Sequence, residues 1–447
     1  MIPERTNPAA RRPQDLMPED YMREETYAPT RLPVEYASTL LPEAYTSQEF
    51  FEIEKERIFA RSWVAVGCAA QVSEPGQILV VEVAGRSVIV VRDKAGELRA
   101  FHNVCRHRAA RLLGEGCHLA RTNRIRCPYH SWTYDLEGNC LGTPLFEGSD
   151  IPPDQQGIFD MGDVKGFDKA DYGLMSVQVD TWGLLVFVNL DPDAAPLAKQ
   201  LGDLPDRTAA HRLDEWRILG HKRYEIAGNY KLVGENFMEY YHLPWVHPEL
   251  LHVSRMEDHY RWQGPGMYTG MCTSPISQNT DAGGFMGLRP ISSLEGTDAD
   301  SGRFMWLFPN TAVNILPNNA FVIIGRPVGP NKTIEDTYIL AHPESTDMPG
   351  ADAEIEQLAH FWDLVNVQDI EIVEEVQHGI SNPAYRGGRM CYRFEEPLHR
   401  FQNMVIDKMV GIERIPPGDV QEMTRMFVDS GGAADEPHGE VSEAVGY

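Results

Sequence analysis

The sequence predicts an α+β protein with two domains, and three observations lead to this prediction. The chain has 447 residues, 42% of them hydrophobic, which can bury more core than a single compact domain usually holds. Short β-type runs separated by glycine-containing turns follow one another over residues 78–104, as an antiparallel sheet requires. Strand-like and helical segments are mixed from about residue 200 onwards, and a long helical stretch covers 352–379.

Composition and periodicity place the expected domain boundaries. The first stretch is rich in Pro, Arg and acidic residues without periodicity, and the last nineteen residues carry five acids and no Lys or Arg. A helix at 46–63 opens with a capping-box pattern. We therefore expect an N-terminal arm at 1–45, a β-rich domain with this leading helix at 46–190, a second domain at 191–428 and a mobile acidic tail at 429–447.

Charge and cysteine content exclude several classes of function. The formal net charge is -26, which disfavours binding to nucleic acid or to an anionic membrane surface. No apolar run is long enough to span a membrane, and no apolar segment follows Arg11 and Arg12 as an export signal would require. Seven cysteines in so long a chain do not indicate a disulfide framework, so we expect a cytoplasmic protein in which clustered cysteines bind metal.

Two short motifs in the β-rich region have the spacing of metal ligands. They are Cys105-x-His107 and Cys127-x2-His130, with nineteen residues between them. Two such pairs are unlikely to be ordinary buried residues. A Cys2His2 zinc site and a Rieske 2Fe-2S cluster are the two alternatives. The second motif is predicted to lie on a turn and a strand rather than on a helix, and the acidic chain does not suit a nucleic-acid-binding zinc finger.

A second set of candidate ligands lies in the second domain. Glu239-x2-His242-x4-His247 places Glu239 and His242 on one face of a helix. Asp369 falls within an apolar stripe of the helix at 352–379. The stripe consists of Trp362, Val365, Asp369, Ile372, Val373 and Val376. A carboxylate on a buried face needs a metal or a cation, and pairing with an arginine is the alternative to a 2-His-1-carboxylate iron site.

The combination of the two motifs resembles the α subunit of the Rieske non-haem iron oxygenases over about residues 40–420. That resemblance implies a Rieske antiparallel β domain and a helix-grip catalytic domain, an antiparallel sheet with helices. It also implies a homotrimer. The Rieske cluster would then be bound by Cys105 and Cys127 on one iron and by His107 and His130 on the other. Likewise, His242, His247 and Asp369 would bind a mononuclear Fe(II), Glu239 would bridge it to the Rieske His of a neighbouring subunit, and Asn236 would support the site.

Glutamate at position 239 resembles the branch of this family that oxidises quaternary ammonium compounds, since most ring-hydroxylating members have Asp there. The expected reaction is hydroxylation by O2 leading to N-demethylation, with electrons from NADH supplied by a separate flavin and iron-sulfur reductase and without a β subunit. Aromatic residues hold trimethylammonium groups, and the candidates are Trp306, Phe308, Tyr241 and Trp245. The alternatives are an aromatic ring-hydroxylating oxygenase or aromatic demethylase with the same iron sites, and a non-catalytic electron carrier or zinc-structured binding protein.

Overall fold

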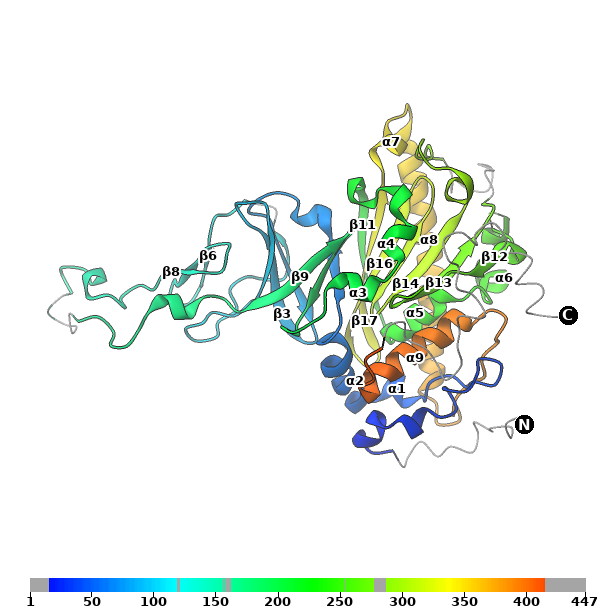
Figure 1. Ribbon diagram of the computed structural model, residues 1–447, viewed down its shortest axis with the longest axis horizontal. Coiled ribbons are helices and arrows are strands. Elements are labelled where there is room, and N and C mark those ends of the chain that lie inside the picture. Colours follow the sequence, from blue (N-terminus) through cyan, green and yellow to red (C-terminus); the bar gives the residue numbers. More distant parts are fainter. Residues whose placement is uncertain are drawn as a thin grey trace. The chain divides into compact units, whose positions relative to one another are not determined.

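The computed structural model describes residues 16–414, with gaps at 119–120, 156, 158–161, 253 and 277–286. The chain divides into two compact units (Figure 1). One unit consists of Ala60–Ala194, and the other combines Met1–Phe59 with Ala195–Tyr447. The acidic tail expected at 429–447 lies outside the described residues.

The unit Ala60–Ala194 is built on antiparallel β structure. Its larger sheet has the strand order β1-β10-β9-β4-β3-β2-β5, and a small sheet has the order β6-β7-β8. The strands are β1 (Val64–Cys68), β2 (Ile78–Val83), β3 (Arg86–Arg92), β4 (Leu98–His102), β5 (Gly116–His118), β6 (Ile125–Arg126), β7 (Thr133–Tyr134), β8 (Cys140–Gly142), β9 (Ser176–Trp182) and β10 (Leu185–Asn189). Between β2 and β3, Ala84 and Gly85 have φ of 51° and 73°, the positive values that a tight two-residue hairpin needs.

The other unit contains a seven-stranded antiparallel sheet with the order β11-β17-β16-β15-β14-β13-β12. Its strands are β11 (Arg217–Ile226), β12 (His259–Arg261), β13 (Tyr268–Thr273), β14 (Gly302–Leu307), β15 (Thr311–Ile315), β16 (Ala320–Gly329) and β17 (Lys332–Ala341). The helices are α1 (Glu43–Thr46), α2 (Gln48–Glu54), α3 (Leu197–Leu201), α4 (Leu204–Arg207), α5 (Tyr230–Met238), α6 (Leu243–Val246), α7 (Pro343–Thr346), α8 (Ala351–Ile380) and α9 (Glu396–Val410).

Helix α5 is the element that brings the expected ligands to the sheet. It packs on β13 to β16 and contacts both α8 and α9. A glycine at position 234 permits this close approach, because a Cβ there would lie only 2.8 Å from the Trp306 ring on β14. The long α8 agrees with the helix expected at 352–379, and an antiparallel sheet covered by helices agrees with the expected catalytic fold.

The leading helix differs from the expectation in its start and in its unit. Helix α2 begins at Gln48, because Ser47 rather than Thr46 caps it by accepting a hydrogen bond from the Phe50 amide at 3.1 Å. It belongs to the unit that contains the seven-stranded sheet, not to the β-rich unit. Glu54 at its end is fully buried and lies 2.7 Å from Nζ of the equally buried Lys231 on α5. This buried ion pair joins α2 to α5.

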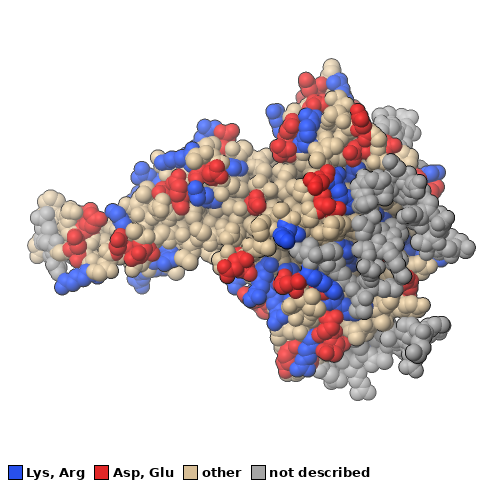
Figure 2. Space-filling view, in the orientation of Figure 1, with Lys and Arg blue, Asp and Glu red and all other residues tan. Residues whose placement is uncertain are grey.

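Among the described residues, no helix is long and apolar enough to cross a membrane. On the face drawn in Figure 2, acidic and basic side chains are interspersed. The side chains drawn in colour on that face therefore form no single acidic patch.

Candidate functional site

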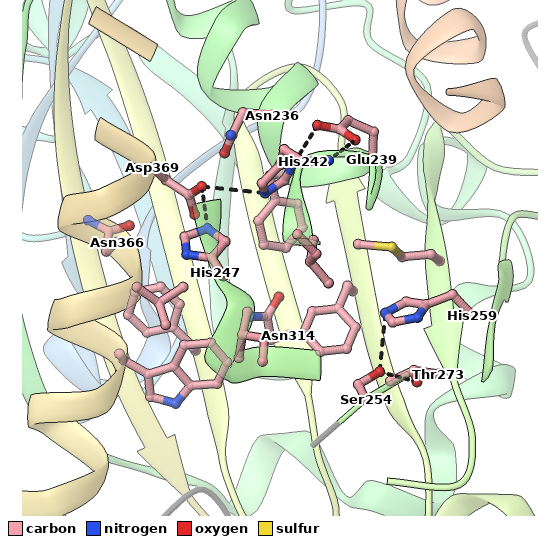
Figure 3. Close-up of a pocket in the computed structure, with 18 of the residues that line it drawn as sticks. Asn236, Glu239, His242, His247, Ser254, His259, Thr273, Asn314, Asn366 and Asp369 are labelled. Carbon is pink, nitrogen blue, oxygen red and sulfur yellow. Dashed lines mark hydrogen bonds and ion pairs between the residues drawn. The ribbon is translucent and has the colours of Figure 1, made fainter. Parts of the chain in front are cut away.

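Three side chains meet beside the sheet: His242 and His247, which are close in sequence, and Asp369, which is far from both (Figure 3). One potential ligand atom from each lies within 4.8 Å of the others. Oδ1 of Asp369 is 2.8 Å from Nε2 of His247 and 3.6 Å from Nε2 of His242. Two imidazoles and one carboxylate with open positions are the donor set that non-haem Fe(II) sites use, so the residues fit such a metal. Their role as ligands stays a prediction.

The local backbone explains how Glu239 and His242 are placed. Helix α5 ends at Met238, the chain is extended at Glu239, and α6 starts after His242 with a proline in its first turn. The Glu239 carboxylate accepts hydrogen bonds from the backbone amides of Tyr241 and His242 and contacts Nδ1 of the His242 ring. Since Nδ1 is occupied in this way, Nε2 of His242 is the nitrogen directed towards Asp369.

Helix α8 supplies Asp369 and a residue that the sequence analysis missed. Gln368 Oε1 lies 2.8 Å from Nδ1 of His247 and thereby orients that ring. Burial lowers the pKa of His247, but Asp369 and Gln368 outweigh that effect and raise it above its usual value. The only signal for Gln368 in the sequence was its place next to Asp369.

The buried stripe of α8 differs in part from the expected one. Trp362, Val365 and Val373 are buried, and the Asp369 side chain is 26% exposed. Ile372 and Val376 are 38% and 42% exposed, because the helix turns them away from the sheet. Asp369 thus lies at the edge of the cavity that the helix covers, rather than within a fully apolar face.

A cavity of about 780 Å³, partly open to solvent, adjoins the three residues. Apolar side chains form most of its wall. Its aromatic lining residues are Phe237, Phe304, Phe321 and Trp362. Phe321 and Trp362 stack face to face with ring centroids 4.8 Å apart. Asn236 also lines the cavity, and Figure 3 shows it beside Asp369 and His242, close to where a supporting residue was expected.

None of the four aromatic residues proposed as a substrate cage lines this cavity in the described structure. Trp306 and Phe308 are buried in the core and pack on Phe401 of α9. Tyr241 and Trp245 are 44% and 71% exposed. Phe304 shares a face of β14 with Trp306, but helix α5 covers the latter, so that only Phe304 reaches the cavity. The described cavity wall therefore gives no support to the predicted cage.

The two Cys/His motifs form a pair of similar loops in the unit Ala60–Ala194. In each loop the residue four positions after the cysteine has positive φ, Ala109 at 56° and Ser131 at 61°. Its amide donates to the carbonyl of Cys105 or Cys127 at 3.0 or 3.1 Å. The loops place the rings of His107 and His130 4.7 Å apart between centroids. Neither cysteine forms a disulfide, and both are buried.

The side chains of these loops fit a Rieske cluster. Among the described residues, nothing hydrogen-bonds to the buried Nδ1 of His107, which leaves that atom free for a metal. Burial, with smaller contributions from His130 and Arg108, lowers the pKa of His107 and keeps the ring neutral, as a ligand must be. Tyr134 was missed by the sequence analysis: its hydroxyl accepts from the Arg106 amide at 3.1 Å and lies 3.3 Å from Cys105 Sγ, to which it would donate when Cys105 is a thiolate ligand.

Comparison with known proteins identifies both units. Residues 62–153 match the Rieske [2Fe-2S] domain, and residues 213–411 match the catalytic domain of the ring hydroxylating alpha subunit. The carnitine monooxygenase oxygenase subunit of Escherichia coli K12 is 30% identical over 360 residues, which span 78% of this chain and 86% of that protein. The chain belongs to the Rieske oxygenase α subunits.

Other relatives of this Rieske oxygenase carry related names. The glycine betaine monooxygenase oxygenase subunit of Chromohalobacter salexigens is 29% identical, over 82% of this chain and 84% of that one. A crystal structure of the quaternary ammonium Rieske monooxygenase CntA with an inhibitor matches with a TM-score of 0.69 and 26% identity, over 87% of this chain and 98% of that one. The enzyme is thus an oxidoreductase with a Rieske 2Fe-2S domain and a mononuclear iron domain, which excludes the zinc alternative for the first cluster.

Proposed function

We propose that this Rieske oxygenase is the oxygenase component of a monooxygenase that oxidises a quaternary ammonium compound, with N-demethylation as the outcome. One observation carries the proposal: the cavity beside His242, His247 and Asp369 is walled by four aromatic rings, and none of its lining residues among those described is Lys or Arg. Aromatic faces attract a cation that cannot donate a hydrogen bond. The names of the relatives agree with this substrate class.

Two separate sets of residues would each bind one metal group. Cys105, His107, Cys127 and His130 would hold the Rieske cluster, and His242, His247 and Asp369 would hold the iron. When bound, the cluster supplies electrons and the iron supplies activation of O2. Gln368 and Glu239 would fix the ring orientations of His247 and His242 through their Nδ1 atoms.

Glu239 would also connect the iron site to the partner cluster. In a homotrimer of the kind that the family resemblance implies, the Rieske His of a neighbouring subunit, His107 or His130, would lie against this carboxylate. Its contact with the His242 ring supports such a role, because the carboxylate already touches one side of the iron site. A separate flavin and iron-sulfur reductase would deliver the electrons of NADH.

The overall reaction balances as a monooxygenation. One oxygen atom of O2 enters a C–H bond of an N-methyl group, and the other leaves as water, with two electrons and one proton derived from NADH and one further proton from solvent. The N-hydroxymethyl product then breaks its C–N bond, releasing formaldehyde, the tertiary amine and the proton of the hydroxyl group. The aromatic rings hold the cationic head, and the mostly apolar wall surrounds the methyl group that reacts.

A single-turnover assay tests the proposal without knowing the reductase. The iron-loaded protein is reduced with dithionite, freed of excess reductant and exposed to O2 with trimethylammonium compounds or with aromatic compounds. We expect formaldehyde only with the trimethylammonium compounds, and no formaldehyde from the matched Asp369→Ala protein. Hydroxylated aromatic products with no formaldehyde would favour the ring-hydroxylating alternative, and an absence of any product would favour a non-catalytic electron carrier.

A further inference from the structure

One side of the cavity is formed by a row of side chains on neighbouring strands of the sheet. Phe304 on β14 is the direct cross-strand partner of Asn314 on β15, which in turn pairs with Phe321 on β16. Direct partners in antiparallel strands project from the same face, with their Cβ atoms about 5 Å apart. All three line the cavity, and Met271, the partner of Phe304 on β13, extends the row. One amide side chain thus lies between two aromatic rings in a row that is otherwise apolar.

Among the described residues, nothing hydrogen-bonds to the side-chain amide of Asn314, although this residue is only 3% exposed. Other polar side chains of the wall are already paired. Asn366 donates to Glu335 at 2.7 Å, and Ser254 Oγ lies 3.2 Å from Nε2 of His259. Burying an amide without a partner costs free energy, so an unpaired amide at a cavity wall indicates a place where a bound molecule completes its hydrogen bonds.

The orientation of this amide follows from the surroundings of its two ends. Oδ1 of Asn314 is enclosed, and since the side chain lines the cavity, its NH2 group is the end that meets the cavity. The reversed amide would enclose two N–H donors instead of one carbonyl oxygen, which is the costlier arrangement. Asn314 therefore offers N–H donors to a ligand. Asn236 also offers an amide, but it is half-buried and lies beside Asp369 and His242 (Figure 3), at the iron end of the cavity.

The row therefore offers two kinds of contact next to each other. The faces of Phe304 and Phe321 attract a quaternary ammonium group, and Asn314 between them donates to an oxygen atom. Because neighbouring side chains in the row are only about 5 Å apart, one compact cation can make both contacts when a short linker joins its nitrogen to the oxygen. A tail that ends in a methyl group would cover Asn314 and leave its donors unpaired.

We propose that Asn314 is a specificity-determining residue, which binds an oxygen atom on the tail of a short quaternary ammonium compound and selects such compounds over alkyltrimethylammonium ions. The inference rests on the proposed function and narrows its substrate class. The shared chemistry is an oxygen that accepts a hydrogen bond, whether it belongs to a hydroxyl or to a carboxylate. A hydrogen bond to a charged acceptor is stronger than one to a neutral acceptor, so the carboxylate should depend more on Asn314 than the hydroxyl does.

Three cations of similar size test the inference by calorimetric binding to the iron-loaded protein. Choline ends in a hydroxyl, glycine betaine in a carboxylate and propyltrimethylammonium in a methyl group. We expect choline to bind about 10-fold more tightly than propyltrimethylammonium to the unaltered protein. Asn314→Val should abolish that preference, weaken glycine betaine by about 10- to 100-fold and leave propyltrimethylammonium unchanged. Asn314→Thr, which differs from Asn314→Val by a hydroxyl in place of a methyl group, should keep part of the preference.

A substitution in the same row provides the control. Phe304→Leu removes an aromatic face but no donor, so it should weaken all three cations alike and keep the preference of choline over propyltrimethylammonium. The thermal midpoint of Asn314→Val should be at or above that of the unaltered protein, because an apolar side chain replaces an unpaired amide. A marked fall would show that the amide has a structural partner and would overturn the inference.

The outcomes separate this inference from the function on which it rests. An unchanged preference for choline in Asn314→Val, with all three cations weakened in Phe304→Leu, would overturn the inference and leave the proposed function standing. Equal losses for all three cations in Asn314→Val would also overturn it, since the amide would then not distinguish one tail from another. Failure of all three cations to bind to the unaltered protein would overturn both.

Discussion

The two metal-binding regions of this enzyme are built in opposite ways. The cluster ligands occupy two short loops that repeat one backbone pattern, with a positive φ four residues after each cysteine. The proposed iron ligands come from the two ends of α6 and from α8, with more than a hundred residues between His247 and Asp369. A site made of local loops depends mainly on its own motif, whereas an assembled site depends on every contact that positions its helices. Substitutions in the two sites should therefore have effects of different size.

The largest expected effect comes from removing a ligand of the assembled site. Asp369→Ala deletes the carboxylate that contacts both histidines, and we expect turnover to be abolished. Because the cluster is held elsewhere, the visible Rieske spectrum should stay intact, and metal analysis should fall from about three irons per chain to about two. Asp369→Glu is the matched control that keeps the charge. Loss of the cluster spectrum in Asp369→Ala would contradict the independence of the two sites.

Breaking the scaffold of the assembled site should have the next largest effect. Glu54→Leu leaves the fully buried Lys231 on α5 without its partner, and we expect a loss of about 3–5 kcal/mol in the free energy of unfolding. Denaturant unfolding followed by tryptophan fluorescence measures this change. The double variant Glu54→Leu with Lys231→Met should recover most of the loss, since no buried charge remains. A change below about 1 kcal/mol in the single variant would show that α5 does not depend on this pair.

Removing a supporting side chain should have a smaller effect. Gln368→Leu takes away the group that orients His247 but leaves all three proposed ligands in place. We expect iron affinity to fall by about 10- to 100-fold, as measured by competition with a chelator. Gln368→Glu, which keeps an oxygen at the same place, should retain most of the affinity. Equal affinity in the leucine variant and the unaltered protein would mean that His247 needs no such support.

The smallest effect is expected in the local site. Tyr134→Phe removes the hydroxyl that donates to Cys105 Sγ. Such a hydrogen bond stabilises the more negative reduced cluster, so its loss should lower the reduction potential. One hydrogen bond is worth about 1 kcal/mol, which corresponds to about 40 mV for one electron. Redox titration of the visible spectrum measures this shift, and a rise in potential would contradict the assignment of the Tyr134 hydroxyl as donor.

The same difference explains how far the sequence alone could be interpreted. The spacing of the cysteines and histidines was enough to predict the two Cys/His loops. The set of His242, His247 and Asp369 was predicted because Asp369 is an acidic residue within an apolar stripe of a predicted helix. The substrate wall could not be found in this way. Whether Phe304 or Trp306 reaches the cavity depends on which part of β14 helix α5 covers, and Gly234 decides that contact. Gln368 and Tyr134 carry no pattern of their own, since each acts through one partner brought near by folding.

The leading helix illustrates the same limit at the level of domains. Its sequence pattern correctly indicated a helix before the β-rich region, and chain order then suggested that it belonged to that region. Its buried acid instead pairs with Lys231, which lies 177 residues further along the chain. The pattern on a single helix indicates that one face is buried, but not which surface covers that face.

The central claim is that electrons held by the local cluster are used for oxidation of a trimethylammonium group in the cavity beside His242, His247 and Asp369. The most direct test mixes the reduced, iron-loaded protein with O2 and choline, and follows the electron paramagnetic resonance signal of the reduced cluster together with formaldehyde. Our account predicts that the cluster signal is lost as formaldehyde appears, and that Asp369→Ala gives no formaldehyde. Formaldehyde formed while the reduced cluster signal persists, or formed equally in Asp369→Ala, would contradict it.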